Sequence, residues 1–124
     1  MENTTVLVIE GNKLNMKLVR SILLLGHYQV IEAGDAETGI QSAREHLPDL
    51  ILMDIRLPGM DGLQATRIIR KDTILSNIPV VALTSYAMQS DEQKAISAGC
   101  TGYITKPIDT RKFLAILSDH LFPS

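Results

Sequence analysis

The sequence predicts a doubly wound α/β fold: one five-stranded parallel sheet with five helices on both faces. The first observation is a set of short apolar runs with the length of buried strands, at 6–9, 30–31, 50–53, 80–83 and 102–104. The second is that longer segments of helical period separate these runs. Because a parallel strand needs a crossover connection, usually a helix, this alternation indicates a parallel sheet covered on both faces.

The first strand and helix have clear boundaries. The run Val-Leu-Val-Ile at 6–9 predicts a buried strand, and Asn12 is a residue type that caps the start of a helix. Gly26 marks the expected end of that helix. Apolar residues recur through it at helical spacing, and we expect them to form its buried stripe: Leu14, Leu18, Ile22 and Leu25.

The next two strands enclose a second amphipathic helix. Val30-Ile31 predicts a strand, Asp35 is a candidate N-cap, and Pro48 precedes the strand at 50–53. Between them an apolar stripe recurs at helical spacing: Ala36, Ile40, Ala43 and Leu47.

The second half of the chain repeats the pattern with weaker helical signals. Helices are expected near 61–72 and 88–98, although these two have the weakest apolar stripes. Asp61 is a possible cap for the first of them, and Pro79 precedes the strand at 80–83. A last strand at 102–104 precedes a helix whose apolar stripe contains Leu114, Leu117 and Leu121.

Composition and charge exclude several classes of protein. Hydrophobic residues make up 45% of the 124 residues, enough for one domain, which we expect to span 1–124 with a core of about 4–121. The net charge of −2 comes without a basic stripe, which argues against a nucleic-acid partner. No run approaches the roughly 20 apolar residues of a membrane span. The start, Met-Glu-Asn-Thr-Thr, lacks the basic n-region of a secretory signal, and the single cysteine excludes an internal disulfide, so we expect a cytoplasmic protein with no membrane partner.

Reactive side chains stand where the predicted strands end. Glu10, Asp54, Thr84 and Lys106 end the first, third, fourth and fifth runs. Ligands bind beyond the carboxyl ends of the strands in open parallel sheets. There, a carboxylate can attack a phosphoryl group if a divalent cation and an ammonium offset the charge on the phosphoryl oxygens, and Mg²⁺ suits such a site because it prefers oxygen ligands. We therefore expect Asp54 to be nucleophile and metal ligand, Glu10 a second acid, Thr84 a hydrogen-bond donor and Lys106 a counter-ion.

Four stretches of the chain together resemble the receiver domain of two-component response regulators. They read Val-Leu-Val-Ile-Glu at 6–10, Asp-Leu-Ile-Leu-Met-Asp at 49–54 followed by Leu-Pro-Gly-Met-Asp-Gly, Pro-Val-Val-Ala-Leu-Thr at 79–84, and Gly-Tyr-Ile-Thr-Lys-Pro at 102–107. Residues 10–15 are similar to the opening of single-domain regulators of the DivK type and of receivers in hybrid kinases. The resemblance covers nearly the whole chain and implies a flavodoxin-like (CheY-like) fold with strand order 2-1-3-4-5.

The resemblance also implies a role for each matching residue. Asp54 would be phosphorylated by a histidine kinase or a histidine phosphotransfer protein, in a reaction that needs Mg²⁺. Glu10, Asp54 and the main-chain carbonyl of Arg56 would hold the metal, and Thr84 would contact the phosphoryl group. The chain would then be a phosphoprotein that signals by contact with a downstream protein, as a monomer or weak dimer, and not an enzyme with turnover of its own.

Two more residues, Lys106 and Tyr103, carry implied roles at the end of the sheet. Lys106 would be the second phosphoryl contact, and Tyr103 would turn inward together with Thr84 as a switch. The family tends to have a cis peptide bond after this lysine, which matches Lys106-Pro107.

Gly11 departs from the family pattern. Family members place two adjacent acids at the end of the first strand, and the second usually ligates the metal, but here that position has no side-chain oxygen. We expect weakened Mg²⁺ binding. One alternative is a working switch in which water replaces the missing ligand, since Mg²⁺ needs only one or two carboxylates. The other is a pseudo-receiver that binds its partner without phosphorylation.

Two further alternatives on related folds fit the sequence less well. A flavin site calls for a loop rich in Ser, Thr and Gly after the first strand, whereas residues 11–15 read Gly-Asn-Lys-Leu-Asn. A phosphatase of the haloacid dehalogenase type resembles this chain less, because it would have an aspartate two residues after the nucleophile, where Arg56 stands.

Overall fold

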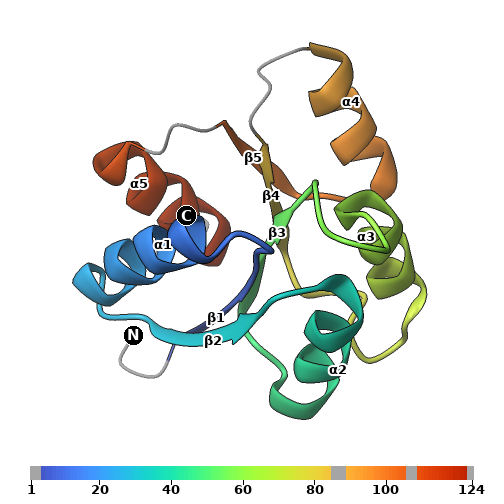
Figure 1. Ribbon diagram of the computed structural model, residues 1–124, viewed down its shortest axis with the longest axis horizontal. Helices are drawn as coiled ribbons and strands as arrows, with labels where there is room; N and C mark the ends of the chain where they lie inside the picture. Colours follow the sequence, from blue (N-terminus) through green and yellow to red (C-terminus); the bar gives the residue numbers. More distant parts are fainter. Residues whose placement is uncertain (1–3, 85–88, 106–108, 123–124) are drawn as a thin grey trace.

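The fold is a five-stranded parallel sheet between two layers of helices, in a computed structural model that describes residues 4–84, 89–105 and 109–122 (Figure 1). The strand order β2-β1-β3-β4-β5 confirms the predicted topology. The strands are β1 Thr5–Ile9, β2 Gln29–Ala33, β3 Leu50–Asp54, β4 Val80–Thr84 and β5 Gly102–Thr105. The helices are α1 Lys13–Leu25, α2 Ala36–His46, α3 Gly62–Lys71, α4 Gln89–Ala98 and α5 Thr110–Leu121.

Two hydrophobic clusters lie on opposite faces of the sheet because the side chains of each strand alternate between the faces. Leu7, Ile9, Ile51 and Met53 belong to the cluster covered by α2, α3 and α4. Val6, Val8, Leu50 and Leu52 belong to the cluster covered by α1 and α5. Every residue of β3 and β4 is buried, as expected for central strands of a parallel sheet.

The predicted helix caps are confirmed. The side chains of Asn12, Asp35 and Asp61 each accept a hydrogen bond from the main-chain N–H three residues later, and so satisfy a donor that the first helical turn leaves unpaired. Gly26 caps the end of α1 through its own N–H. The helices expected near 61–72 and 88–98 are present as α3 and α4, but the weak apolar stripe expected of both is found only in α4, since α3 is strongly amphipathic.

The predicted buried stripe of α1 is wrong for three of its four residues and right for Ile22. Leu14, Leu18 and Leu25 are exposed to 78%, 47% and 70%, whereas the helix buries Val19, Ile22 and Leu23. This helix has apolar residues on more than one side, and periodicity alone does not decide which side meets the sheet. Leu47, assigned to the stripe of α2, is also exposed, because it lies beyond the helix as its C-cap with a left-handed backbone (φ 48°).

Candidate functional site

The carboxyl edge of the sheet brings three of the predicted residues together. Ile9 pairs with Met53 in the β1–β3 register, so the residues that follow them, Glu10 and Asp54, lie side by side on neighbouring strands. Asp54 in turn pairs with Leu83 of β4, which places Thr84 one residue further along the next strand. Glu10, Asp54 and Thr84 are only 2%, 5% and 5% exposed.

Local backbone geometry orients both carboxylates in the same way. The main-chain N–H of Asn12 donates to Oε1 of Glu10 at 3.2 Å, and that of Arg56 donates to Oδ1 of Asp54 at 3.1 Å. In each case the chain turns back over the strand end, so that an N–H two residues later meets the carboxylate. Both side chains are therefore held at the edge of the sheet.

The donor set fits a hard divalent cation. Two nearly buried carboxylates lie at the ends of adjacent strands, and a cation between them would compensate their negative charge. Their oxygens, with main-chain carbonyls and water, are the ligands that Mg²⁺ prefers. Within residues 4–84, 89–105 and 109–122, no group of three or more His, Cys, Asp or Glu could hold a metal. A site for Mg²⁺ here would thus depend on two carboxylates only.

Gly11 lies between the two loops that border this edge. A Cβ at this position would meet Cδ of Pro58 at 3.0 Å and the carbonyl oxygen of Gly34 at 3.6 Å. The first contact is tight, so an acidic side chain here would require the Pro58 ring to move by a few tenths of an ångström. Glycine at this position therefore leaves room for Pro58 and the β3–α3 loop where they lie in this structure.

The start of α3 presses against the main chain of Asp54. The N–H of Gly62 donates to the carbonyl of Ile55 at 2.9 Å, and a Cβ on Gly62 would overlap the carbonyl oxygen of Asp54. Only glycine permits this approach. The signal was visible in the sequence as the Gly of the Met-Asp-Gly turn, although its contact was not.

Of the last two predicted residues, the structure describes Tyr103 but not Lys106. Tyr103 lies on β5 opposite Ala82 of β4, half-buried against the hydrophobic cluster on the α2–α3–α4 face. Lys106, with the proposed cis bond to Pro107, lies outside the described residues.

A family model for the response regulator receiver domain matches residues 6–118. This chain belongs to the response regulator receiver family. The polar-differentiation response regulator DivK of Brucella anthropi is 41% identical over 117 residues, which are 94% of this chain and 95% of that protein. Such domains act in two-component signalling and interact with histidine kinases or phosphotransfer proteins and with downstream targets.

Solved structures agree with this membership. The receiver domain of a Pseudomonas aeruginosa sensor histidine kinase is 33% identical, with a TM-score of 0.90 over 96% of this chain and 98% of that one, and its structure contains a magnesium ion coordinated in the active-site cleft. A chemotaxis response regulator of Vibrio cholerae, 24% identical, has the same fold, with a TM-score of 0.91 over 96% of this chain and 99% of that one. No helix among the described residues of this receiver is long and apolar enough to cross a membrane.

Two grooves of different charge flank the receiver's candidate site. One, of about 340 Å³, is lined by Lys13, Lys17 and Arg20 of α1 together with Glu10 and Glu32. Sequence reasoning missed this basic row, although its i, i+4, i+7 spacing was the available signal. Arg20 forms an ion pair with Glu32 at 3.4 Å, which leaves the two lysines to set the sign of the outer part of the groove.

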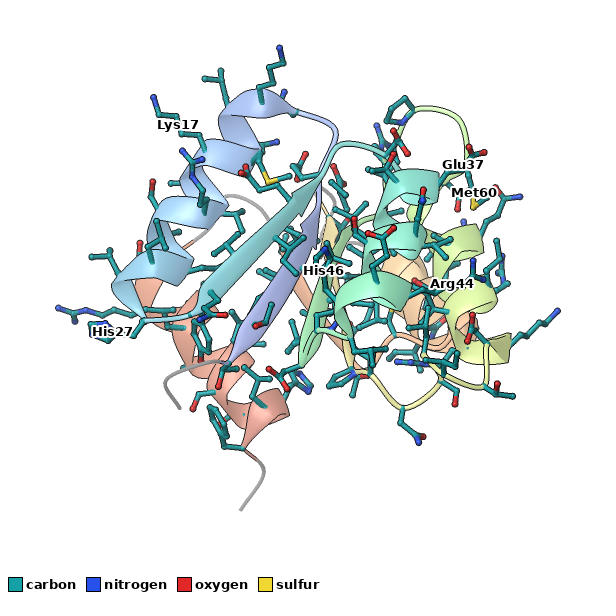
Figure 2. All side chains as sticks on the ribbon, turned by 90° about the horizontal axis from the view of Figure 1, so that it is seen from below. Lys17, His27, Glu37, Arg44, His46 and Met60 are labelled. Carbon is teal, nitrogen blue, oxygen red and sulfur yellow. The ribbon has the colours of Figure 1, made fainter. Side chains whose placement is uncertain are left out.

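The second groove, of about 400 Å³, has an acidic wall. It is lined by Asp35 and Glu37 at the start of α2 and by Pro58 and Met60 of the β3–α3 loop. Figure 2 shows Lys17 on one side of the strand ends and Glu37 with Met60 on the other. Hydrogen bonds from the main chain and side chain of Thr38 hold the pKa of Asp35 below its ordinary value and so favour its charged form.

Proposed function

We propose that this receiver accepts a phosphoryl group on Asp54 from a histidine kinase or phosphotransfer protein and passes the signal on by protein contact. The observation that carries the proposal is the nearly buried Asp54 carboxylate at the end of β3, with Glu10 and Thr84 at the neighbouring strand ends. A carboxylate fixed in this way can attack phosphorus in line, and the Thr84 hydroxyl would donate a hydrogen bond to the transferred group. Lys106 would supply the counter-charge.

A bound Mg²⁺ would supply charge neutralisation for the transferring phosphoryl group. Glu10, Asp54 and the main-chain carbonyl of Arg56 are the groups proposed to hold it. The Arg56 N–H, which donates to Oδ1 of Asp54, keeps that carboxylate in place for the metal and for the attack. Since Gly11 adds no ligand, water would complete the shell, and affinity for the metal would be lower than with two adjacent acids.

The test is intact mass after incubation with acetyl phosphate and Mg²⁺. The parent chain should gain roughly 80 Da, the mass of one phosphoryl group. Asp54→Asn should gain nothing, while Asp119→Asn, a change of the same kind on the exposed side of α5, should behave as the parent. Chelation of Mg²⁺ should abolish the gain. An adduct that persists in Asp54→Asn would refute the proposed acceptor.

The second candidate is a pseudo-receiver that binds its partner without phosphorylation, and Gly11 is the observation that favours it. The two candidates differ in their response to the metal. A slow switch should form the adduct faster as Mg²⁺ concentration rises, because more sites are filled. A pseudo-receiver should form none at any Mg²⁺ concentration, and only Gly11→Asp should then give an adduct.

A further inference from the structure

The last turn of α3 carries an arginine whose guanidinium joins two connections far apart in sequence. Nε of Arg70 donates to the carbonyl of Gly99 at 2.7 Å, and Nη2 to the hydroxyl of Thr101 at 3.2 Å. Nη1 donates to the carbonyls of Ile78 at 2.7 Å and Ser76 at 3.2 Å. Burial lowers the pKa of Arg70, but a guanidinium stays charged at neutral pH, and its hydrogen bonds are correspondingly strong. One side chain thus ties the end of α4 to the segment before β4.

The end of α4 is shaped to receive this side chain. Gly99 has a φ of +109°, and a Cβ there would run into the aliphatic part of Arg70, so the arginine stem packs directly over the glycine. The N–H of Cys100 closes the helix on the carbonyl of Ala95 at 2.9 Å. Thr101 is fixed in turn to Val80, whose N–H donates to its hydroxyl and whose carbonyl accepts from its N–H.

The contacts of Arg70 with Gly99 and Thr101 form a junction between α3 and the end of α4. One face of α3 connects this junction with the candidate phosphoacceptor. Gly62, Thr66 and Arg70 are four residues apart and therefore lie along one side of the helix. Gly62 presses on the main chain of Asp54, as described above. The buried hydroxyl of Thr66 donates to the carbonyl of Gly62 at 2.8 Å and lies 3.8 Å from Sγ of Cys100.

Apart from this junction, few of the described side chains of α4 are buried against the rest of the protein. Over residues 92–98, only Ala95 and Ala98 are buried, while Ile96 is 58% exposed. Burial of two methyl groups contributes little, so the hydrogen bonds of Arg70 matter more here than they would beneath a leucine-rich helix.

We propose that Arg70 is a positioning residue that fixes the C-terminal end of α4, so that this helix responds to phosphorylation by pivoting about Gly99–Thr101. The fixed end follows from the contacts of Arg70 alone. Its use as a pivot rests on the proposed function.

The reactivity of the single cysteine, Cys100, measures how often the fixed end of α4 opens. Cys100 is 7% exposed and lies between α3 and the end of α4, so a thiol reagent can reach it only when this junction opens. Arg70→Met keeps most of the aliphatic stem and removes all five donors. We expect native-state labelling of Cys100 to become about tenfold faster or more, because local opening governs access to a buried thiol.

Matched variants separate this effect from general destabilisation. Arg67→Met makes the same change at an exposed position of α3 and should label at the parent rate. Arg70→Lys should restore slow labelling in part, because an ammonium still reaches one carbonyl. If Arg70→Met does not fold, Arg70→Lys decides in its place, because its ammonium cannot reproduce the fork of donors of the guanidinium: labelling faster than in the parent supports the fixed end. If the folded Arg70 variants label Cys100 at the parent rate, the proposed fixed end is overturned.

Phosphorylation then tests the pivot. In parent chain whose adduct is verified by mass, hydrogen exchange should change in the first turns of α4 while the Cys100 labelling rate stays the same. In Arg70→Met the change should spread to Ala98–Thr101. If phosphorylation accelerates Cys100 labelling of the parent as much as the Arg70→Met substitution does, the pivot is overturned. Absence of any adduct overturns the proposed function instead, while labelling of the unphosphorylated variants still decides whether Arg70 fixes this end of α4.

Discussion

At the scale of single residues, Gly11 is the position at which we expect binding of Mg²⁺ to be weakened. The position is exposed and borders both carboxylate-bearing strands, but it provides no oxygen. Its neighbour Pro58 lies close to where a side chain would begin. An acidic residue at this position would therefore act in two ways, through an added charge and through its contact with the β3–α3 loop.

Gly11→Asp separates these two effects when it is compared with Gly11→Ala. The aspartate should raise the affinity for Mg²⁺ by about tenfold or more, equivalent to about 1.4 kcal/mol, because it adds a charge and a ligand. The alanine makes the same contact with Pro58 and should leave the affinity unchanged. Calorimetric titration with Mg²⁺ measures both. Equal affinities for the parent and Gly11→Asp would show that the position does not reach the metal.

At the scale of elements, α1 has apolar residues on a buried side and on an exposed side. Leu23 is completely buried against the sheet, whereas Leu14, on the same helix, is 78% exposed.

Leu23→Ala and Leu14→Ala form a matched pair that checks this division. Leu23→Ala should lower the free energy of unfolding by about 2–5 kcal/mol through lost burial and the cavity left behind. Leu14→Ala should change it by less than about 0.5 kcal/mol. Urea denaturation followed by circular dichroism gives both values. Similar losses in the two variants would contradict the observed orientation of α1.

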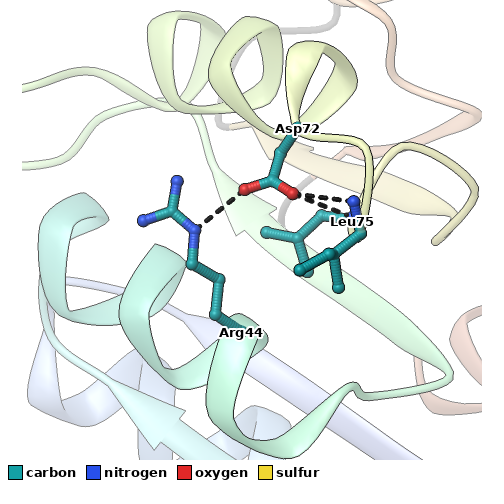
Figure 3. A network of polar contacts seen from close by, with 4 residues as sticks. Arg44, Asp72 and Leu75 are labelled. Atoms are coloured by element: carbon teal, nitrogen blue, oxygen red, sulfur yellow. Dashed lines mark hydrogen bonds and ion pairs between the residues drawn. The ribbon is translucent and has the colours of Figure 1, made fainter.

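An ion pair between Arg44 and Asp72 joins α2 to the end of α3. Nε of Arg44 donates to Oδ2 of Asp72 at 2.8 Å, while Oδ1 accepts from the N–H of Ile74 at 2.8 Å and more weakly from that of Leu75 (Figure 3). Together these bonds, first that of Arg44, hold the pKa of Asp72 below its ordinary value of 3.8. The lowered pKa means that folding favours the charged form. Its stabilisation is present above pH 3.8 and is lost as the pH falls through the folded-state pKa.

Asp72→Asn should therefore be less stable than the parent at pH 7, and the difference should shrink as the pH falls below 3.8. Asparagine keeps the shape and one acceptor oxygen but cannot ionise, so the comparison isolates the charge. Asp119→Asn on the exposed side of α5 is the control and should show no comparable difference at pH 7. Urea unfolding across this pH range provides the measurement. A difference between parent and Asp72→Asn that does not depend on pH would rule out ionisation as the cause.

At the scale of the whole molecule, the candidate site lies between surfaces of unlike charge. The lysines of α1 border one side of the strand ends and the acids of α2 border the other (Figure 2). A small phosphodonor needs neither surface. A donor protein approaching Asp54 would meet at least one of them, and charge complementarity would then set its rate of association.

Lys17→Glu should accordingly slow transfer from a phosphorylated histidine phosphotransfer protein that labels the parent, by about tenfold at low salt. Labelling by acetyl phosphate should not change. Lys94→Glu, at an exposed position of α4, makes the same reversal of charge away from this groove and should have little effect. Added salt should reduce the gap between Lys17→Glu and the parent. If both reversals slow transfer equally, net charge rather than α1 governs the encounter.

The sequence by itself determined the order of strands and helices, the three caps at Asn12, Asp35 and Asp61, and the acids that end β1 and β3. These features depend on residues close together in the chain, where periodicity and turn chemistry are visible. Tertiary structure alone decided which side of α1 meets the sheet, that Pro58 lies against Gly11, and that Arg70 reaches Gly99 and Thr101. Such contacts join residues dozens of positions apart, and only the packing of helices onto a common sheet brings them together.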